Sequence, residues 1–527
     1  MIRIRQIKID VDSTSISNLK KLVANKLDVN VDSIENIYIN KRSLDARKKP
    51  KLYFIYEVDI TINNEEYLLS KNKSQDVLKS PDTKYTLEKT GINKIENLCI
   101  VGAGPAGLMC AYTLAKNGFK PIIIERGKPV EQRVEDINEF WETGMLKTNS
   151  NVQFGEGGAG TFSDGKLNTL IKDKECRCKY FFETLVQCGA PDDILYDAKP
   201  HIGTNLLRNV IINLRKEIIQ MGGTFKYDSL VTDITMDDSS IKSIVINNDE
   251  EIDTNCVVFA IGHSARDTFR MLYNKKIEME SKPFAIGLRI MHNQKMINKS
   301  QIGIEEHQVL KQQSYKLTHN TIDKRGVFTF CMCPGGYVVN ASSHENKLVV
   351  NGMSNHERES GVANSAIIVT IDSNDYGNEI LDGLKYIENI ESSAFNLLNG
   401  AIPIQLFSDY KNNIKTTKLG NIKPAIKGKY DFANLRNILS EEIDLAIIDA
   451  INNFGRKIKN FDIDDSILAG VETRTSSPIK IVRTEGLESS ISGIFPCGEG
   501  SGHAGGITSA AIDGIKVAEA IAKKYLY

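Results

Sequence analysis

Residues 97–127 read NLCIVGAGPAGLMCAYTLAKNGFKPIIIERG, and this stretch decides the fold. A short apolar run, Leu98 to Val101, is typical of a buried parallel strand. It leads directly into the glycine-rich turn GAGPAG at 102–107. An apolar helix is predicted from Leu108 to Asn117, and a second buried strand from Pro121 to Ile124. Strand, turn, helix and strand in this order predict the start of a parallel βαβ fold.

The three glycines of this turn have separate tasks in a dinucleotide-binding fold. Gly102 allows the tight turn, Gly104 lets the backbone approach a pyrophosphate, and Gly107 lets the helix pack on the strand. The free N–H groups at the start of the helix face the phosphates. Glu125 ends the second strand about 20 residues further on, where a carboxylate accepts a ribose hydroxyl. The sequence therefore predicts an adenine dinucleotide site.

Two further strings match the same glycine spacing but lack its context. GEGGAG at 155–160 follows a polar segment and precedes no apolar helix. GSGHAG at 500–505 precedes a helix, but neither a second strand nor an acidic residue follows that helix. We therefore expect one dinucleotide fold, and no dedicated second fold for a nicotinamide cofactor.

The bulk properties are those of a globular protein with about three domains. The 527 residues carry a net charge of −1, which argues against a chain dominated by polyanion binding. The N-terminus alternates apolar and charged residues, unlike a signal peptide. No uninterrupted apolar run of about 18 residues occurs, so we expect no membrane span. The nine cysteines follow no disulfide framework, which favours reduced thiols and a cytoplasmic location.

The sequence pattern divides the chain into three expected domains. Residues 1–92 predict a small α+β domain, with strands at 2–11, 34–40 and 52–60, a helix at 17–27 and a basic turn at 41–51. That turn is either solvated or a docking surface for a partner protein or RNA. Residues 93–275 and 456–527 form the expected α/β, Rossmann-like domain. Residues 276–455, rich in alternating strands, form an inserted, mainly-β substrate domain.

The motifs together resemble the glutathione-reductase-like class of FAD-binding proteins. The marks are GAGPAG with Glu125-Arg126, a strand ending in Ala260-Ile-Gly262, and Gly498-Glu499 where that class has Gly-Asp. In that class the C-terminal acid binds the ribityl chain, the backbone near Val231 contacts adenine, and the last helix points its N-terminus at the flavin. The resemblance implies FAD contacts at Gly102, Gly104, Pro105, Ala106, Gly107, Glu125, Arg126, Arg133, Gly157, Gly158, Gly160, Thr161, Val231, Ala260, Gly262, Gly498, Glu499, Gly505, Gly506 and Ile507.

Longer strings resemble an uncharacterised family of bacterial FAD-dependent oxidoreductases or dehydrogenases. Among them are FGEGGAGTFSDGKLNT at 154–169, AIGHSARDTF at 260–269, CMCPGG at 331–336 and GVETRTSSP at 470–478. The resemblance runs nearly end to end and implies non-covalent FAD without an assigned substrate. The glycine-rich loop 153–168 is expected to lie along the flavin, because glycines allow close backbone approach.

Three side chains are the catalytic candidates. His503 lies among glycines beside Glu499, His201 precedes a helix, and Arg474 could clamp an anionic group. The alternatives are structural histidines and an ion pair between Arg474 and Glu472 or another acid.

The cysteine pairs Cys176/Cys178 and Cys331/Cys333 have a shorter spacing than structural zinc sites favour, so no metal site is expected. A redox role remains open for Cys331 and Cys333, since thiols exchange electrons with flavins.

We therefore expect an FAD-dependent oxidoreductase that transfers hydride between the flavin and a small molecule, with transient NAD(P)H as a possible partner. The alternatives are a flavin-dependent RNA-modifying enzyme and a non-enzymatic redox-sensing flavoprotein that docks through residues 1–92.

Overall fold

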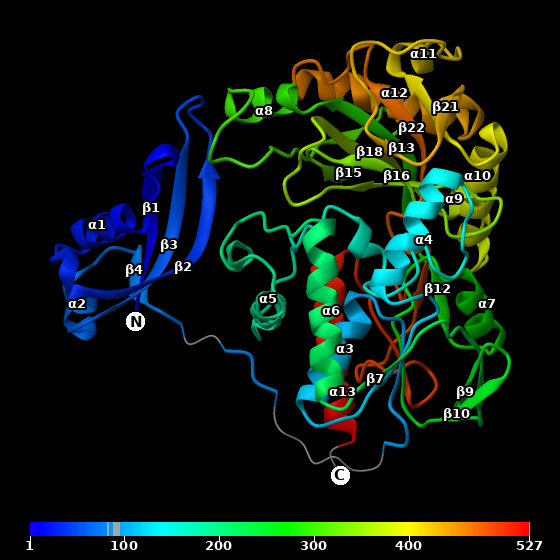
Figure 1. The fold of residues 1–527 in the computed structure, drawn as a ribbon, viewed down its shortest axis with the longest axis horizontal. Coiled ribbons are helices and arrows are strands. Elements are labelled where there is room, and N and C mark those ends of the chain that lie inside the picture. Colours follow the sequence, from blue (N-terminus) through cyan, green and yellow to red (C-terminus); the bar gives the residue numbers. More distant parts are fainter. Residues whose placement is uncertain (82–83, 88–94, 526–527) are drawn as a thin grey trace.

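The molecule has three units, which Figure 1 shows as an N-terminal domain (blue) beside a two-part body. The structure is a computed structural model of the chain, and it describes residues 1–81, 84–87 and 95–525. The expected domain boundary at 92–93 lies outside the described residues. No helix in these described ranges combines the length and apolar character needed to cross a membrane.

A five-stranded parallel sheet forms the centre of the dinucleotide-binding domain. Its strand order is β24-β11-β5-β6-β7, and every neighbouring pair is parallel. The strands are β5 (Cys99–Val101), β6 (Ile122–Ile124), β7 (Thr224–Lys226), β11 (Val257–Phe259) and β24 (Ile494–Pro496). Strand β5 is fully buried, as expected where helices cover both faces of a parallel sheet. The predicted Rossmann-like α/β fold is confirmed.

Helix α3 (Pro105–Lys116) follows the glycine-rich turn, and the C-terminal helix α13 (Ile507–Lys524) packs against it. The packing is close because Gly514 faces α3, where a Cβ atom would lie 2.1 Å from the Ala106 carbonyl oxygen. The other helices of this domain are α4 (Val130–Thr143), α5 (Arg177–Gln187), α6 (Thr204–Gln220) and α7 (Arg266–Asn274).

The pattern of segment 224–234 alone indicates a single strand, but the structure shows two. It divides into β7 and β8 (Val231–Met236), which belong to different sheets. Strand β8 joins a small antiparallel sheet with β9 (Ile241–Ile246) and β10 (Glu250–Asp253). The bend between the strands, with Asp228 at φ 51°, separates segments that apolar alternation alone reads as continuous.

The inserted domain is built on a seven-stranded sheet in the order β14-β15-β18-β13-β22-β19-β21. Its strands are β13 (Phe284–Asn293), β14 (Thr318–Asn320), β15 (Gly326–Cys333), β18 (Val362–Ile371), β19 (Ile402–Leu406), β21 (Tyr430–Phe432) and β22 (Ile467–Glu472). Strand β22 lies beyond residue 456, where we expected the chain to return to the first domain, yet it pairs with β13 and β19.

A three-stranded sheet and five helices complete the inserted domain. The sheet holds β16 (Tyr337–Asn340), β17 (Val350–Met353) and β20 (Ile426–Lys427). The helices are α8 (Gln294–Ile302), α9 (Ser373–Tyr376), α10 (Asp382–Leu398), α11 (Phe407–Lys411) and α12 (Glu441–Lys457). A short ladder of β12 (Met279–Ser281) and β23 (Ile479–Ile481) lies where the two parts of the body join.

The N-terminal domain is a four-stranded antiparallel sheet in the order β2-β3-β1-β4, with two helices. Its elements are β1 (Ile2–Asp10), α1 (Ile16–Leu27), β2 (Ile34–Asp45), β3 (Tyr53–Ile62), α2 (Glu65–Lys71) and β4 (Val77–Lys79). The basic turn predicted from residue 41 is wrong in its first half, because Lys41 to Asp45 continue β2 and pair with β3. Strand β2 is an edge strand, where charged side chains are tolerated.

Candidate functional site

The glycine-rich turn after β5 has the geometry that a bound pyrophosphate requires. Gly102 has a φ of +101°, and its N–H donates to the Ile124 carbonyl oxygen at 2.8 Å. A Cβ atom on Gly107 would lie only 1.9 Å from the Gly102 oxygen, so this position tolerates no side chain. Gly104 is different, because the nearest atom to a Cβ there is the Gly158 Cα at 3.8 Å. Gly104 therefore leaves open space at the N-terminus of α3, where N–H groups attract phosphate.

Glu125 lies at the end of β6 and is held rigidly in the cavity wall. Its carboxylate accepts hydrogen bonds from the N–H groups of Ala103 at 2.8 Å, Gly127 at 2.9 Å and Gly155 at 3.0 Å. The side chain is 5% exposed. It thus joins three loops around the predicted ribose position. Val231 lines the same end of the cavity.

Arg126 and Arg133 differ in where the structure places them. Arg126 lines the cavity, stacks its guanidinium 4.2 Å from the centre of the Phe154 ring, and pairs with Asp267 at 2.7 Å. Arg133, expected to contact the cofactor, is fully buried behind the loop 151–158. Its guanidinium donates to five carbonyl oxygens of that loop, those of residues 151, 152, 155, 156 and 158. Arg133 therefore shapes the loop and does not line the cavity.

The loop itself contributes some, but not all, of its predicted contacts. Gly158 and Gly160 line the cavity. Gly157 faces inward, where a Cβ atom would lie 2.1 Å from the Thr161 hydroxyl oxygen, and neither residue belongs to the cavity lining. The loop thus lines the cavity in short consecutive runs, at 153–155, 158–160 and 163–166, while residues such as Gly157 and Thr161 anchor it to the core.

The C-terminal motif closes the opposite side of the cavity. Glu499 lines the wall, and its Oε1 lies 3.1 Å from His263 Nδ1. Gly498, at φ +76°, packs on Ala106 and donates its N–H to Asp513 at 2.8 Å, so it supports the turn from behind. The first residues of α13 also face the cavity, together with the strand end at β11; the lining residues are Gly505, Gly506, Ile507, Ala260 and Gly262.

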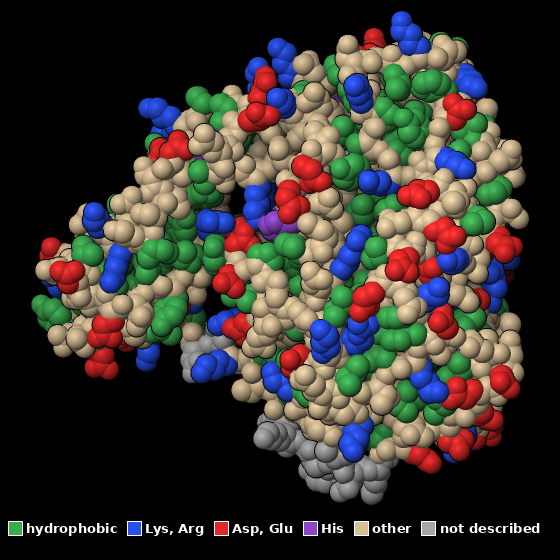
Figure 2. Space-filling view, in the orientation of Figure 1, with side chains coloured by type: hydrophobic (Ala, Val, Ile, Leu, Met, Phe, Trp, Pro, Cys, Tyr) green, Lys and Arg blue, Asp and Glu red, His purple; other side chains and the backbone are tan. Residues whose placement is uncertain are grey.

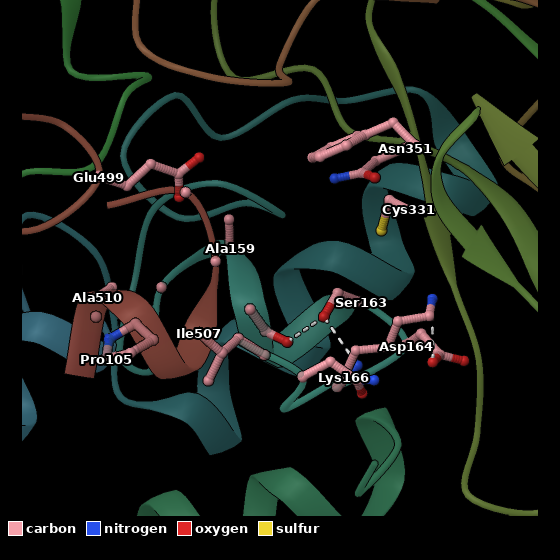
Figure 3. Close-up of a pocket in the computed structure, with 18 of the residues that line it drawn as sticks. Pro105, Ala159, Ser163, Asp164, Lys166, Cys331, Asn351, Glu499, Ile507 and Ala510 are labelled. Carbon is pink, nitrogen blue, oxygen red and sulfur yellow. Dashed lines mark hydrogen bonds and ion pairs between the residues drawn. The ribbon is translucent and has the colours of Figure 1, made fainter. Parts of the chain in front are cut away.

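These walls enclose one continuous cavity of about 1040 Å³. Figure 3 shows it between Glu499 and Ile507 on one side and Cys331 and Asn351 on the other. The surface is hollowed where the N-terminal domain meets the body (Figure 2), and the cavity is also lined from that domain by Thr14, Arg42, Ser43, Leu44, Ala46 and Phe54. The volume is at the upper end of the roughly 300–1,000 Å³ typical of ligand pockets.

The residues present fit a bound FAD. The open face of Gly104, the Glu125 carboxylate and the Glu499 carboxylate all lie in the cavity wall. Two buried wall atoms, Gln153 Nε2 and His263 Nε2, have no hydrogen-bond partner among the described residues. Buried polar atoms of this kind need a partner, and a polar ligand supplies one.

Of the three catalytic candidates, only Arg474 lies in the cavity wall. Its guanidinium donates to both oxygens of Glu391, at 3.1 and 3.3 Å, and to the hydroxyls of Ser264 and Ser343. The anticipated ion pair is therefore made with Glu391, a residue on α10. Glu472 instead pairs with Arg289 at 2.6 Å.

The two histidine candidates do not line the cavity. His503 directs Nε2 at the Ile481 carbonyl oxygen, 2.8 Å away, and burial lowers its pKa. His201 is 2% exposed, stacks on His356 with 5.1 Å between ring centres, and has its pKa lowered to about 3 by burial. His201 is thus a neutral structural ring at physiological pH.

Several residues of the cavity wall were not predicted from the sequence. Asp164 and Lys166, from the loop between α4 and α5, form an ion pair at 3.2 Å and face the inserted domain (Figure 3). Asn351 of β17 faces them from the opposite wall. The only available signal was the motif TFSDGKLNT, which marks the loop but not the direction of a single side chain. Within the described residues, no cluster of three or more His, Cys, Asp or Glu could hold a metal ion.

Comparisons with known proteins agree with this architecture. Residues 283–475 match the family model "FAD-dependent protein, C-terminal domain-like", residues 100–130 match an NAD(P)-binding Rossmann-like domain, and residues 1–61 match a domain of unknown function. Two similar solved structures are the flavin-dependent brominase Bmp2 (14% identity, 82% of this chain and 81% of that one, TM-score 0.36) and L-proline dehydrogenase from P. horikoshii (13%, 82% and 95%, 0.33). These sequence identities and TM-scores are too low to support a functional conclusion.

A relative from Clostridium beijerinckii, named "Uncharacterized protein", is 43% identical over 531 residues and covers 99% of both chains. Its alignment spans all three domains, so the whole architecture is shared. The matched family model adds the cofactor, FAD. The chain therefore belongs, with this relative, to a family of FAD-dependent oxidoreductase-like proteins.

Proposed function

We propose that the protein is an FAD-dependent oxidoreductase that exchanges a hydride between the flavin and a small organic molecule. The observation that carries the proposal is the single cavity that extends from the GAGPAG turn to the sheet of the inserted domain. The first end has the backbone and carboxylate groups that suit FAD, and the far end has polar groups that FAD alone does not need. When bound, the flavin supplies the two-electron chemistry.

The proposed binding mode of FAD is that of the glutathione-reductase-like class. Glu125 accepts the ribose hydroxyls of the adenosine, and the N-terminus of α3 stabilises the pyrophosphate. Glu499 accepts hydroxyls of the ribityl chain. The N-terminus of α13 lies near the ring end, where its positive dipole stabilises negative charge on a reduced flavin.

We assign proton handling at the cavity to His263 and not to His503. His263 follows the strand-end turn of β11, and Glu499 holds its Nδ1 at 3.1 Å. A carboxylate on one ring nitrogen fixes the tautomer and leaves the other nitrogen for exchange with a ligand. Nε2 of His263 is that other nitrogen, and it has no partner among the described residues.

The substrate end is proposed to lie between the inserted domain and the N-terminal domain. Lys166 and Arg474 place positive charge in the wall, which favours a substrate with an anionic group. The electron donor or acceptor is proposed to be transient NAD(P)H, which shares the cavity because the sequence has one dinucleotide fold.

The decisive experiment is reconstitution with FAD followed by anaerobic absorbance titration. The holoprotein should show a flavin spectrum, and NADH, NADPH or one member of a metabolite panel should bleach it. A Glu499→Gln variant tests the ribityl contact, and Glu485→Gln, on an exposed turn, is the matched control. A protein that binds no flavin after reconstitution refutes the proposal. Flavin that binds but is reduced by none of the panel would instead favour a redox sensor.

The alternative that the N-terminal domain docks RNA has less support than the oxidoreductase proposal. Arg42 pairs with Asp197 at 2.6 Å, Arg47 pairs with Asp45 at 2.8 Å, and Lys49 donates to the Ser300 carbonyl oxygen. Three cations of the basic segment are thus already engaged within the chain. We therefore propose that residues 1–92 complete the substrate cavity, and that any docking partner uses their outer face. Salt-sensitive co-purification of RNA would reverse this preference.

A further inference from the structure

Strand β15 carries a bulge that separates its two cysteines. The register of β15 against β18 shifts between Phe330 and Cys333, and Cys331 has a φ of +43°. In a regular strand, residues two apart would share one face. The bulge instead turns Cys331 into the cavity wall, while Cys333 stays fully buried behind it. Bulges commonly re-aim a side chain beside an active site.

The two cysteines remain neighbours despite this separation. The Cys333 thiol donates a hydrogen bond to the Cys331 carbonyl oxygen at 3.2 Å. Gly352 covers Cys333 closely, since a Cβ atom there would lie 2.7 Å from its sulfur. One thiol is therefore presented to the cavity, with a second thiol held directly behind it.

Positive charge surrounds the cavity-facing thiol. Lys166 donates to the Met332 carbonyl oxygen, next to Cys331, and pairs with Asp164 at 3.2 Å. Arg289 donates to the Cys331 carbonyl oxygen at 3.3 and 3.4 Å, and its own partner is Glu472. Figure 3 shows the Cys331 sulfur directed into the pocket, on the side of Ser163 and Lys166.

This setting favours a thiolate at Cys331 and a thiol at Cys333. The neighbouring Cys333 thiol and the charges of Lys166 and Arg289 lower the pKa of Cys331 below that of an ordinary thiol, against the effect of burial and of Asp164. The neighbouring Cys331 and burial raise the pKa of Cys333. An attacking thiolate backed by a protonated thiol is the arrangement that thiol–disulfide chemistry requires.

The other Cys-x-Cys pair lacks this setting. Cys176 and Cys178 lie at the start of α5, outside the cavity wall. Burial raises the pKa of Cys178 to about 11. The two pairs share a spacing and differ in cavity access and charge, so one serves as a control for the other.

We propose that Cys331 and Cys333 form a redox-active dithiol that exchanges two electrons with the bound flavin. The inference rests on the proposed function. In the oxidising direction the Cys331 thiolate and the Cys333 thiol join through a new S–S bond. The S–H bond of Cys333 breaks, and its proton and the two electrons pass to oxidised FAD, which becomes the reduced anion. The reverse direction returns the pair to thiolate and thiol and the flavin to its oxidised form.

The first test needs no flavin activity. Apoprotein is equilibrated in glutathione buffers of graded redox poise, quenched in acid, alkylated and digested with trypsin. The peptide 326–347 contains both cysteines and no other. We expect it to convert to a disulfide, lighter by two hydrogens, in the wild type but not in Cys333→Ser. The double variant Cys176→Ser/Cys178→Ser should behave as the wild type does. Free thiols at both positions in every buffer would overturn the proposal.

The second test measures the thiolate itself. The alkylation rate of Cys331 in reduced apoprotein is followed against pH, and its midpoint should lie well below the 8.5 or so of an ordinary cysteine. Lys166→Met should raise that midpoint, and Lys166→Arg should keep it low. The other charged groups that face the pair are Asp164, Arg289 and Glu472, and they stay unchanged in both variants. A wild-type midpoint of about 8.5 would contradict a functional thiolate.

The third test separates this inference from the proposed function. Reductive titration of oxidised holoprotein should consume about two electron pairs per bound flavin in the wild type and about one in Cys331→Ser, because each disulfide takes one pair. One pair in both proteins refutes the dithiol while the flavoprotein function stands. Failure to bind flavin at all refutes the function, whatever the state of the thiols.

Discussion

The buried carboxylate of Glu391 joins the dinucleotide-binding domain to the inserted domain, and its neutralisation should destabilise the body strongly. Glu391 lies on α10 and is 0% exposed. It accepts hydrogen bonds from Arg266 of α7 at 2.7 Å, from Arg474 at 3.1 and 3.3 Å, and from the Thr473 hydroxyl at 2.7 Å. Glu391→Gln preserves the shape but removes the negative charge that both buried guanidinium groups contact.

The expected loss follows from those contacts. Removing one partner of a buried ion pair costs about 3–5 kcal/mol, because the remaining charge is left uncompensated. For a domain of the size of the inserted one, each kcal/mol lowers the melting temperature by about 2–4 °C. Glu391→Gln should therefore lower it by roughly 6–20 °C. The carboxylate contributes this stability at neutral pH, and its pKa is held well below the usual range by the two arginines.

The control lies one turn earlier on the same helix. Glu388 pairs with Arg270 at 2.7 Å, where the Arg270 side chain is 43% exposed, and it lies farther from Arg266, at 3.9 Å. Glu388→Gln should cost at most about 1 kcal/mol, as exposed ion pairs do. Thermal unfolding of both variants, followed by circular dichroism at two salt concentrations, compares them directly. Equal shifts in the two variants, or no shift in Glu391→Gln, would refute the reasoning.

Three further predictions concern the turn, a buried histidine and the domain contact. Gly107→Ala should prevent folding, because its Cβ overlaps the Gly102 turn. Gly104→Ala should keep the fold, as measured by circular dichroism, and should weaken FAD binding at least about tenfold in a fluorescence titration. Burial lowers the pKa of His201 to about 3 in the folded protein. As pH falls below about 6.5, this histidine therefore takes up a proton in the unfolded chain but not in the folded one. The free energy of unfolding should then fall by up to about 1.4 kcal/mol per pH unit. Urea unfolding should show a shallower decline in His201→Gln, and an unchanged slope would contradict the assignment. Arg42 pairs with Asp197, so Arg42→Ala should speed amide hydrogen exchange in β2. The double variant Arg42→Ala/Asp197→Asn should exchange no faster than Arg42→Ala alone. Additive effects of the two substitutions would show that the two side chains act independently.

The sequence predicted those features that depend on neighbouring residues. The turn after β5, the helix α3 and the acid at the end of β6 follow one another within about 30 residues, so their order alone specifies the βαβ unit. Arg474 could likewise be nominated because it stands in a distinct charged motif. The cofactor followed from the same local motifs.

Other features depended on contacts between distant segments, and local patterns could not supply them. Strand β22 pairs with β13 across more than a hundred intervening residues, so its membership of the inserted sheet is invisible in its own composition. His503 and His263 both follow glycine turns, yet one binds a backbone carbonyl and the other lies in the cavity wall. The direction of each ring is set by the element packed against it.

The sequence by itself determined that the protein has one Rossmann-like fold and binds FAD, because glycine geometry and strand–helix order are local properties of the chain. Only the tertiary structure decided what surrounds the rest of the cofactor. It placed Arg133 behind the loop, brought Arg42 of the N-terminal domain to the cavity, and turned Cys331 inward through a bulge. These outcomes arise from register and packing between segments far apart in the sequence, where a shift of one residue changes which side chain faces the cavity.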